Sequence, residues 1–347
     1  MASPMVGLPV GTPVSPVGSP HNSSIMVIGS LNADLVTYTP RIPAAGETMA
    51  ANGFRTGMGG KGANQAVACA KMGRRRDALA RGTQEKDAVP VYMVGAVGDD
   101  VYGQSLTAAL TAAGVDVSGV AVRTGQSTGV AVIIVDEAAG GENRIMLSAE
   151  ANGSLAPDAY TASLPTTLAG HLPRLLLLQL EIPLATVLQI LDTAHRQGVD
   201  VLLNAAPAQT LPDSYYKCIT HLVVNETEAS LLSGTALDLA VVDAAQRDKQ
   251  LSRVAGHFLA LGVQHVVITL GAAGVYHATA SASGHVAAIK TKVVDTTAAG
   301  DTFIGAYALA LVQGQTVADA VQWANRAAAV AVGRRGAQES IPWLDEL

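Results

Sequence analysis

The sequence predicts an α/β fold: a Rossmann-like, doubly wound, mostly parallel sheet covered by helices and carrying a small β-sheet lid. Three observations predict it. From about residue 26 onward, short β-branched runs alternate with Ala-rich stretches of helical periodicity. Several of the runs end on a polar residue, as expected where parallel strands open into a ligand crevice. Two other stretches contain strands without intervening helices, which is typical of a separate small sheet.

The first segment, residues 1–24, is rich in Pro, Gly, Ser and Val and contains no Lys or Arg. It lacks the charged start of a signal peptide and the arginines of a transit peptide, so we expect a disordered tail on a cytoplasmic protein. Residues 25–347 are predicted to form one domain. The net charge of -6 offers no basic surface for nucleic acid or an anionic membrane, and the apolar runs are too short to span a bilayer. Two cysteines are too few for a disulfide framework or a thiolate metal site.

The first strand, 26–28, ends in the segment Gly-Ser-Leu-Asn-Ala-Asp, which places Asn32 and Asp34 two residues apart. A carboxylate accepts from two hydroxyls, while an amide both donates and accepts, so the pair suits the vicinal hydroxyls of a sugar. An ordinary Asx turn would produce the same pattern.

A glycine loop over 57–65 opens a predicted helix, 63–72. It matches G-x-G-x-x-G, but a dinucleotide site needs an acidic residue after the next strand, and Asp77 lies in a charged insertion. The loop is not a P-loop, because Gly62 stands where Ser or Thr should hold magnesium. We therefore expect its backbone and Asn64 to approach a polyhydroxylated ligand.

The stretches around 35–56 and 127–148 are predicted as lid strands, the second with a turn at Gly140 and Gly141. A lid over the crevice would exclude water from a transferable group, and such a sheet could also dimerise. The charged insertion 74–87 lacks periodicity and is predicted to be a surface loop.

Four predicted core strands end on polar residues that would face one crevice. The strands and their final residues are 175–180 with Glu181, 199–203 with Asn204, 222–224 with Asn225, and 266–268 with Thr269. Glu228 lies one turn after Asn225, where both could hold water on a Mg²⁺ that bridges phosphates. A helix capping box would explain the same two residues.

The segment 293–303 reads as strand, small-residue loop and helix, with the helix continuing over 304–312. Ala298, Ala299 and Gly300 would let a phosphate approach the free N–H groups and the positive end of the helix dipole. Asp301 would repel that phosphate unless it takes a proton from the attacking group, so the charge fits a general base. Capping of the helix by Asp301 is the alternative.

Together, the segments 29–34, 59–66, 225–228 and 295–303 resemble the ribokinase, or PfkB-like, family of carbohydrate kinases over about residues 25–343. The resemblance implies a Rossmann-like kinase domain with a lid that clasps a second subunit as a homodimer, and transfer of the γ-phosphate of ATP to O5 of D-ribose. It implies Mg²⁺ and an activating K⁺ as cofactors. Asp301 would be the catalytic base.

The resemblance also assigns binding residues by position. The substrate positions are Asn32, Asp34, Gly59, Gly60, Lys61, Gly62, Ala63, Asn64, Glu181 and Asp301. The nucleotide positions are Asn225, Thr269, Leu270, Gly271, Ala272, Ala273, Gly274, Ala299, Gly300 and Asn325. Glu228 matches the water-mediated Mg²⁺ position, and the K⁺ positions are Asp295, Thr297, Ala331, Arg334, Gly336 and Ser340. The chain departs from the common pattern at Asn325, at Glu339, in the insertion 74–87 and in the segment 204–207, which has Ala where the family usually has Pro.

The sequence leaves the acceptor open. Adenosine kinase is disfavoured because a nucleoside base needs aromatic surfaces and the chain has only three Phe and two Trp. Deoxyribose, fructose and other hexoses stay possible, because a difference of one carbon or one hydroxyl depends on the geometry of the lid. An oxidoreductase would depend on the glycine match at Gly57. A non-catalytic sugar-binding protein would not need Asp301.

Overall fold

The computed structural model describes residues 23–81, 88–139, 142–238 and 243–347. Most of the predicted tail, the end of the insertion and the predicted turn at residues 140 and 141 lie outside the described residues. No helix in the described ranges is long and apolar enough to cross a membrane.

Nine of the described strands form a central sheet in the order β13-β12-β11-β10-β9-β8-β1-β4-β5. Every pairing from β5 to β11 is parallel, while β12 and β13 pair antiparallel at one end. Chain order runs from β1 to β5 on one side and from β8 to β13 on the other, so the topological switch point lies between β1 and β8. The strands are β1 (Ile25–Ile28), β4 (Val91–Gly98), β5 (Asp116–Arg123), β8 (Leu175–Leu178), β9 (Asp200–Asn204), β10 (His221–Asn225), β11 (His265–Thr269), β12 (Val275–Ala278) and β13 (Ser283–Val286).

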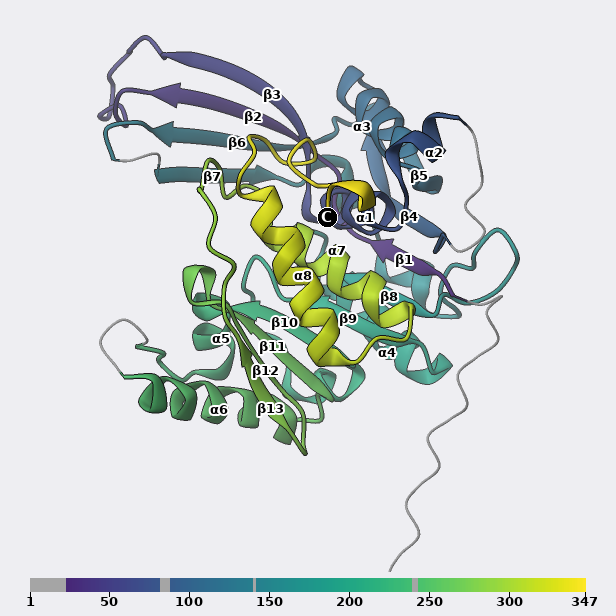
Figure 1. Cartoon of the computed structure of the whole chain (residues 1–347). Coiled ribbons are helices and arrows are strands. Elements are labelled where there is room, and N and C mark those ends of the chain that lie inside the picture. Colours follow the sequence, from purple (N-terminus) through teal and green to yellow (C-terminus); the bar gives the residue numbers. More distant parts are fainter. Residues whose placement is uncertain (1–22, 82–87, 140–141, 239–242) are drawn as a thin grey trace, which may run out of the picture.

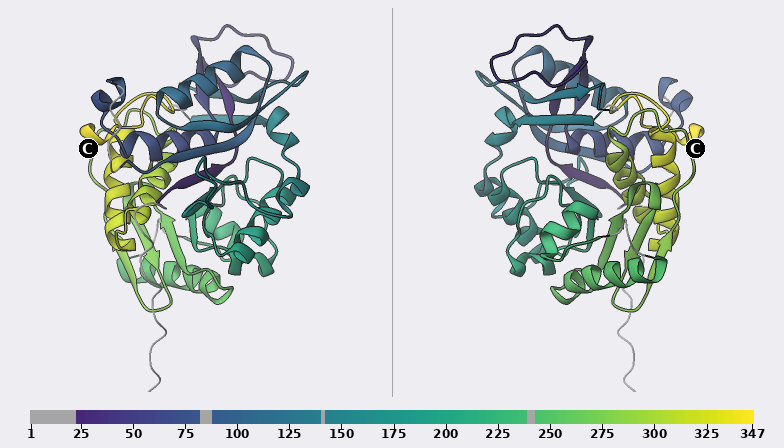
Figure 2. Two further views of the ribbon diagram at one scale, coloured as in Figure 1. Left: turned by 90° about the vertical axis from the view of Figure 1, so that its right-hand side faces the viewer. Right: turned by 90° about the vertical axis from the view of Figure 1, so that its left-hand side faces the viewer.

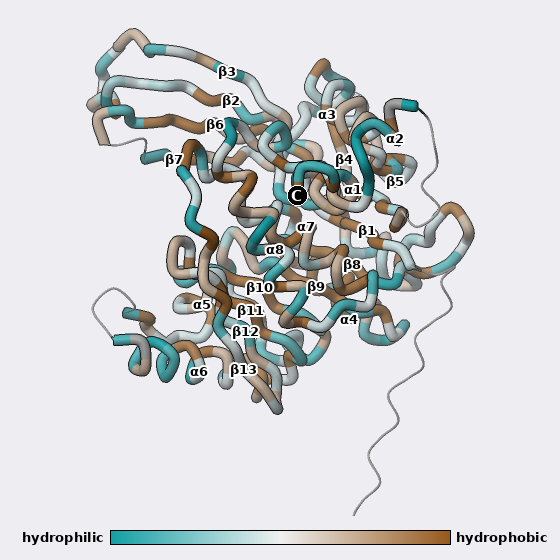
Figure 3. The backbone as a smooth tube through the Cα atoms, in the orientation of Figure 1, coloured by the Kyte–Doolittle hydropathy of each residue, from teal (hydrophilic) through white to brown (hydrophobic). Residues whose placement is uncertain are grey.

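Helices cover both faces of this sheet, with α7 and α8 on one side and α4 on the other in Figure 2. The alternation of strand side chains explains the two layers: Ile25 and Val27 of β1 join one hydrophobic cluster, while Met26 and Ile28 join the other. Hydrophobic residues accordingly run through the central strands in Figure 3. The first cluster contains residues of α1 (Lys61–Met72), α3 (Val101–Ala112), α7 (Ala299–Val312) and α8 (Val317–Ala331); the second contains residues of α4 (Leu184–Gln197), α5 (Glu226–Ser233) and α6 (Ala244–Ala260).

The predicted lid is a separate four-stranded sheet that projects from one side of the body in Figure 1. Its order is β3-β2-β6-β7, with β2 and β6 parallel and the other pairs antiparallel. The strands are β2 (Asn32–Thr39), β3 (Gly53–Gly59), β6 (Gly129–Asp136) and β7 (Glu142–Ser148). The predicted fold class, an α/β sheet with a small β lid, is therefore confirmed.

Three local predictions need correction. The strand predicted at the start of the segment 293–303 is absent, because the N–H groups of Val294 and Asp295 donate to the Val332 carbonyl after α8 and not to a neighbouring strand. Gly57 and Gly59 belong to β3 rather than to a free loop, because they pair with Asp34 and Asn32 of β2. The insertion is not wholly a loop, since Arg76–Ala80 forms a short helix, α2. Contacts that are distant in sequence hold α2: the Arg76 N–H donates to the Asp345 carboxylate at 2.9 Å, and its guanidinium lies 5.9 Å from the Trp343 ring centroid. Short 3-10 turns occupy Glu150–Ser154, Pro157–Tyr160, Asp213–Cys218, Gly271–Ala273 and Leu344–Glu346.

Candidate active site

The site is built where the first turns of α1 and α7 meet. The two helices pack closely around Gly305 of α7, where an added Cβ would lie 2.3 Å from the Cβ of Ala68 in α1. Only a glycine allows this approach. One turn earlier on each helix, the contact brings Asn64 and Gln65 to Asp301.

Asp301 is buried, and both of its oxygens accept hydrogen bonds from α1. Asn64 Nδ2 donates to Oδ2 at 3.0 Å, and Gln65 Nε2 donates to Oδ1 at 3.0 Å. The N-cap of α7 is Ala298, and no side chain caps the helix. The alternative interpretation of Asp301 as a helix cap is therefore wrong, and its carboxylate points toward the site instead.

The N-terminus of α7 opens into the same space. Ala298 has the left-handed backbone angles φ 58° and ψ 11°, an uncommon conformation for alanine that turns the chain into the helix. The Ala299 N–H donates to the Thr296 carbonyl at 3.2 Å, whereas the N–H groups of Gly300 and Asp301 make no hydrogen bond with any other described residue. These two donors and the helix dipole can bind an anion.

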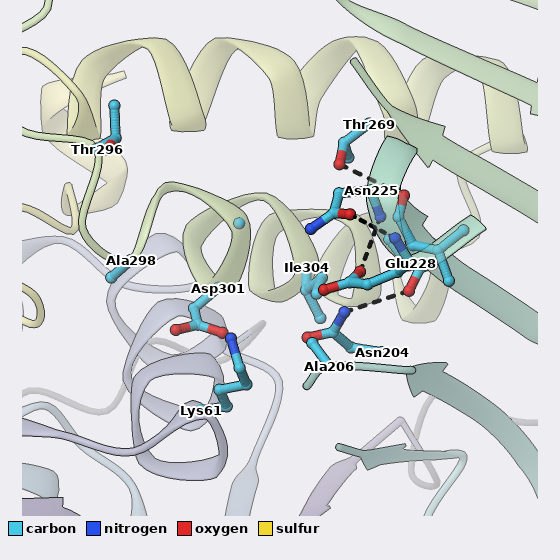
Figure 4. Close-up of a pocket in the computed structure, with 13 residues that line it drawn as sticks. Lys61, Asn204, Ala206, Asn225, Glu228, Thr269, Thr296, Ala298, Asp301 and Ile304 are labelled. Carbon is cyan, nitrogen blue, oxygen red and sulfur yellow. Dashed lines mark hydrogen bonds between the residues drawn. The ribbon is translucent and has the colours of Figure 1, made fainter. Parts of the chain in front are cut away.

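A cavity of about 200 Å³ lies against this helix end, and Figure 4 shows the side chains around it. Residues from α1, α7 and the carboxyl ends of β9, β10 and β11 surround it. The lining consists of Lys61, Asn204, Ala206, Val223, Val224, Asn225, Glu228, Thr269, Thr296, Ala298, Gly300, Asp301 and Ile304. Asn204, Asn225 and Thr269 line this cavity as the strand-end prediction requires, whereas Glu181 after β8 does not.

Lys61, at the start of α1, brings a positive charge to the cavity. Burial lowers the pKa of its ammonium, but the negative charges of Asp301, Glu181 and Glu228 outweigh burial and hold the pKa above its ordinary value. Lys61 therefore stays charged and can face an anionic ligand in the cavity.

Asn225 and Glu228 form the capping box of α5. The Asn225 N–H donates to Glu228 Oε2, and the Glu228 N–H donates to Asn225 Oδ1, both at 2.8 Å. The helix capping box that the sequence allowed is thus present, and both side chains also line the cavity. Burial raises the pKa of Glu228 above its ordinary range.

A second group of polar side chains meets at the switch point between β1 and β8. Glu181 Oε2 accepts from the Ser30 hydroxyl at 2.6 Å, from Asn32 Nδ2 at 3.3 Å and from the Lys61 N–H at 3.0 Å. The sequence motifs after β1, before α1 and after β8 therefore converge, although they lie far apart in the chain.

Asp34 also lies in this group, and its carboxyl makes no hydrogen bond to any described residue. Its carboxyl is buried, and burial together with the charges of Glu181, Asp301 and Glu339 raises its pKa to about 7. Gly59 makes the room, since a Cβ there would lie 2.2 Å from Asp34 Oδ2. Asp34 is thus not part of an Asx turn and is open to hydroxyl donors. Asn64 Oδ1 is also buried without a partner.

Only some of the other residues predicted to bind the nucleotide line the cavity. Thr269 lines the cavity, and the segment that follows turns at Gly271 and at Gly274, which has φ 101°. Asn325 does not line the cavity; its Nδ2 donates to the Ala287 carbonyl at 2.7 Å.

Of the six predicted K⁺ positions, Thr297 and Gly336 are hydrogen-bonded to Asp295. Its Oδ1 accepts from the Thr297 hydroxyl at 2.6 Å and the Thr297 N–H at 2.9 Å, while Oδ2 accepts from the Gly336 N–H at 2.9 Å. Burial raises the pKa of Asp295, but these hydrogen bonds outweigh burial and lower it. The Arg334 guanidinium bonds to Glu346 at 3.1 Å, and the Ser340 hydroxyl to the Ala337 carbonyl at 2.8 Å.

Sequence reasoning missed several residues that hold the site together. Asn152 donates from Nδ2 to Asn32 Oδ1 at 2.8 Å and accepts from the Leu31 N–H at 3.0 Å. It lies in a 3-10 turn without a motif, so no local signal could have found it. Gln65 lies inside the quoted glycine motif and Asn204 at a predicted strand end, but neither had an assigned role.

Comparisons with known proteins show the family of the chain. Residues 22–344 match the sequence pattern described as "pfkB family carbohydrate kinase". The chain belongs to this kinase family. Among curated relatives, the chain is similar to a ribokinase of Schizosaccharomyces pombe, with 42% identity over 93% of this chain and 96% of the relative. A ribokinase of Haemophilus influenzae is 34% identical with the same two coverages.

Solved structures of the pfkB family share the fold. The chain superimposes on the ribokinase of Thermotoga maritima with a TM-score of 0.75 and 33% identity, covering 93% of this chain and 97% of that one. It superimposes on a structure of Arabidopsis thaliana ribokinase, complexed with ribose and ATP, with a TM-score of 0.76 and 29% identity, covering 93% and 96%. As a carbohydrate kinase of this family, the chain is an ATP-dependent sugar phosphotransferase.

Proposed function

We propose that this chain transfers the γ-phosphoryl group of ATP to O5 of D-ribose, giving D-ribose 5-phosphate and ADP. The observation that carries the proposal is the position of Asp301. Its carboxylate lies in the first turn of α7 beside two free N–H donors, and Asn64 and Gln65 hold it away from a capping role. A base and an anion site side by side are what phosphoryl transfer to a hydroxyl requires.

In this mechanism Asp301 accepts the proton of the ribose O5 hydroxyl as O5 attacks the γ-phosphorus. The new O5–P bond forms while the bond from the γ-phosphorus to the β,γ-bridging oxygen breaks, and ADP leaves. The N–H groups of Gly300 and Asp301 stabilise the charge on the transferring phosphoryl oxygens, and the ammonium of Lys61, which also lines the cavity, adds a positive charge. Bound Mg²⁺ would supply charge neutralisation on the phosphates.

Glu228 fits a water-mediated role toward Mg²⁺. Among the described residues, the Asn225 N–H is the one hydrogen-bond donor to the Glu228 carboxylate, and it binds Oε2, which leaves Oε1 for a water ligand. Magnesium in proteins usually keeps several waters and few direct protein ligands, which suits this role.

The sugar subsite in this proposal consists of Asn32, Asp34, Asn64, Glu181 and residues 59–63, where β3 passes into α1. Asp34 and Asn64 Oδ1 have open acceptor sites, and Asn32 has an N–H to spare. Buried acceptors that bind hydroxyls discriminate strongly between sugars, because a sugar that lacks a hydroxyl leaves an acceptor unpaired.

The cytoplasmic location stays a prediction from the sequence.

The nucleotide would occupy the side of the cavity formed by Asn225, Thr269 and the segment 270–274. Asn325 would act through its hydrogen bond to Ala287 rather than by direct contact.

Hydrogen bonds around Asp295 bring Thr297 and Gly336 together beside the α7 N-terminus, which suits a K⁺ ion. We expect K⁺ to increase kcat over Na⁺ in matched chloride buffers. Equal rates in both salts would contradict the cation site.

The lid is the proposed dimer contact. Phe54 is 64% exposed on β3 at one edge of the lid, and Ile145, Met146 and Leu147 are exposed on β7 at the other edge, so a second lid would find exposed apolar side chains to bury. Light scattering of the purified protein should give the mass of two chains, and Ile145→Glu should give one.

The test of function is an ATP-consumption assay with D-ribose, deoxyribose, fructose and adenosine as acceptors. Ribose should give the highest kcat/KM. A preference for deoxyribose, fructose or adenosine would reject the ribose assignment and keep the kinase class, whereas the absence of acceptor-dependent turnover would favour a sugar-binding protein.

A further inference from the structure

A chain of buried side-chain amides continues behind Asp301 from Gln65. Gln65 Nε2 donates to Asp301 Oδ1 at 3.0 Å and to Asn204 Oδ1 at 3.1 Å. Its Oε1 accepts from Gln179 Nε2 at 2.7 Å. Gln65 and Gln179 are completely buried, and Asn204 nearly so. The three amides come from α1, from the residue after β8 and from the end of β9.

The direction of every hydrogen bond in this chain is fixed by its two ends. An ionised Asp301 can only accept, and so can the Val223 carbonyl, to which Asn204 Nδ2 donates at 3.2 Å. Asn204 must therefore turn Oδ1 toward Gln65, and Gln65 must turn Nε2 toward both Asp301 and Asn204. The Gln65 amide cannot rotate without losing three hydrogen bonds, so it holds one oxygen of Asp301 in place.

Packing alone does not explain these amides. Burying an amide costs free energy unless each polar atom is paired, and Gln179 Oε1 is buried with no hydrogen bond to a described residue. Gly29 is required beside it, because a Cβ there would lie 2.0 Å from Gln179 Oε1. An apolar side chain would fill the same volume without that cost.

We propose that Gln65 is a positioning residue for Asp301, and that Gln179 and Asn204 fix the orientation of Gln65. The inference rests on the proposed function of Asp301 as general base. Asn64 holds Oδ2 and Gln65 holds Oδ1, both from α1, so the carboxylate plane is set before the sugar arrives. A base misplaced by a fraction of an ångström loses much of its rate advantage.

The experiment compares Gln65→Met with a matched control, Gln189→Met. Gln189 is a hydrogen-bonded glutamine of α4 in the other helical layer, where it donates to the Thr193 hydroxyl. With D-ribose and ATP, Gln65→Met should lower kcat at least ~10-fold and leave KM for ribose within about twofold, because ground-state contacts remain. Gln189→Met should match the wild type.

The same substitution is then made in the Asp301→Asn protein. If Gln65 acts only through the base, Gln65→Met should cause no further loss of kcat in that background. An equal fold-loss in both backgrounds would reveal a general structural effect and overturn the inference, as would an unchanged kcat in Gln65→Met alone.

Thermal unfolding establishes that each variant is folded. If Gln65→Met does not fold, Gln179→Met carries the test, since it removes only the bond to Gln65 Oε1; lower kcat supports the inference and unchanged kcat overturns it. Failure of the proposed function looks different, because the wild type and Gln189→Met would then both fail to phosphorylate ribose.

Discussion

At the scale of single residues, the site depends on carboxylates in different surroundings. Among the described residues, two side-chain amides donate hydrogen bonds to the Asp301 carboxylate, three groups donate to one oxygen of Glu181, and none donates to the Asp34 carboxylate. Each set of surroundings suits a different role. Asp301 is oriented as a base, Glu181 anchors the surrounding loops, and Asp34 is left free to accept hydrogen bonds from sugar hydroxyls.

Asp301→Asn tests the base. We expect kcat to fall at least ~10²-fold, the usual scale for removing a general base, while ribose binding measured by calorimetry changes little. Asp248→Asn, at an exposed position of α6, is the matched control and should behave as the wild type. Near-normal turnover in a pure Asp301→Asn protein would exclude Asp301 as the base.

Asp34→Asn should separate stability from function. The folded-state pKa of about 7 lies above the ordinary value of 3.8, so the ionised carboxylate destabilises the free protein as pH rises through 7. Each unit of pKa shift corresponds to about 1.4 kcal/mol. The variant should therefore gain unfolding free energy over the wild type at pH 8, gain less at pH 5, and bind ribose more weakly. A gain that does not depend on pH would contradict the origin in Asp34 ionisation.

At the scale of elements, the site depends on the crossing of α1 and α7. Gly305 lets the helices approach until Asn64 and Gln65 reach Asp301. The short β1 and β8 strands do the same for the sugar side, since their parallel pairing brings the residues after Ile28 and Leu178 to the same edge of the sheet.

Gly305→Ala should separate the two helices. The added methyl would meet Ala68 and the backbone of Cys69, so we expect a loss of about 1–3 kcal/mol in unfolding free energy and a lower kcat. Gly256→Ala is the matched control, because Gly256 lies within α6 with open space around its Cβ position. That change should stabilise the protein by about 0.5–1 kcal/mol and leave kcat unaltered. Equal behaviour of the two variants would contradict the role of the close crossing.

At the scale of the whole molecule, stability should depend on two imidazoles at the starts of β10 and β11, of which His221 is buried and His265 half-buried. His221 stacks on His265 with 4.4 Å between ring centroids, and His221 Nδ1 lies 2.9 Å from the Tyr307 hydroxyl of α7. Burial lowers the pKa of both rings, most strongly for His221. The folded protein therefore keeps both neutral where the unfolded chain takes up protons.

Below about pH 6.5, the ordinary pKa of histidine, the unfolding free energy should fall with pH by up to about 1.4 kcal/mol per unit for each ring. Urea unfolding of His221→Gln between pH 7 and 5 should show a shallower fall than the wild type, whatever its stability at pH 7. An unchanged slope would show that His221 does not titrate on unfolding.

Local sequence patterns were enough to predict much of the fold and of the candidate site. The alternation of short strands and Ala-rich helices indicated the sheet, polar residues at strand ends indicated the crevice, and the small residues before Asp301 indicated the anion site. These are properties of neighbouring residues, which a single segment of sequence contains. The extent of β3 and the α2 helix were missed because contacts from distant residues, such as Asp34 and Asp345, decide them.

The sequence by itself determined the fold class, the kinase family and the identity of the candidate base. Only the tertiary structure decided between Asp301 as a helix cap and Asp301 as a carboxylate facing the site, because both explanations use the same residues and differ only in which donors reach the oxygens. It also revealed Asn152, Gln65, Gln179 and Asn204 as a buried polar frame. Hydrogen bonds between residues more than a hundred positions apart leave no periodic trace in a chain, since they depend on how separate elements pack.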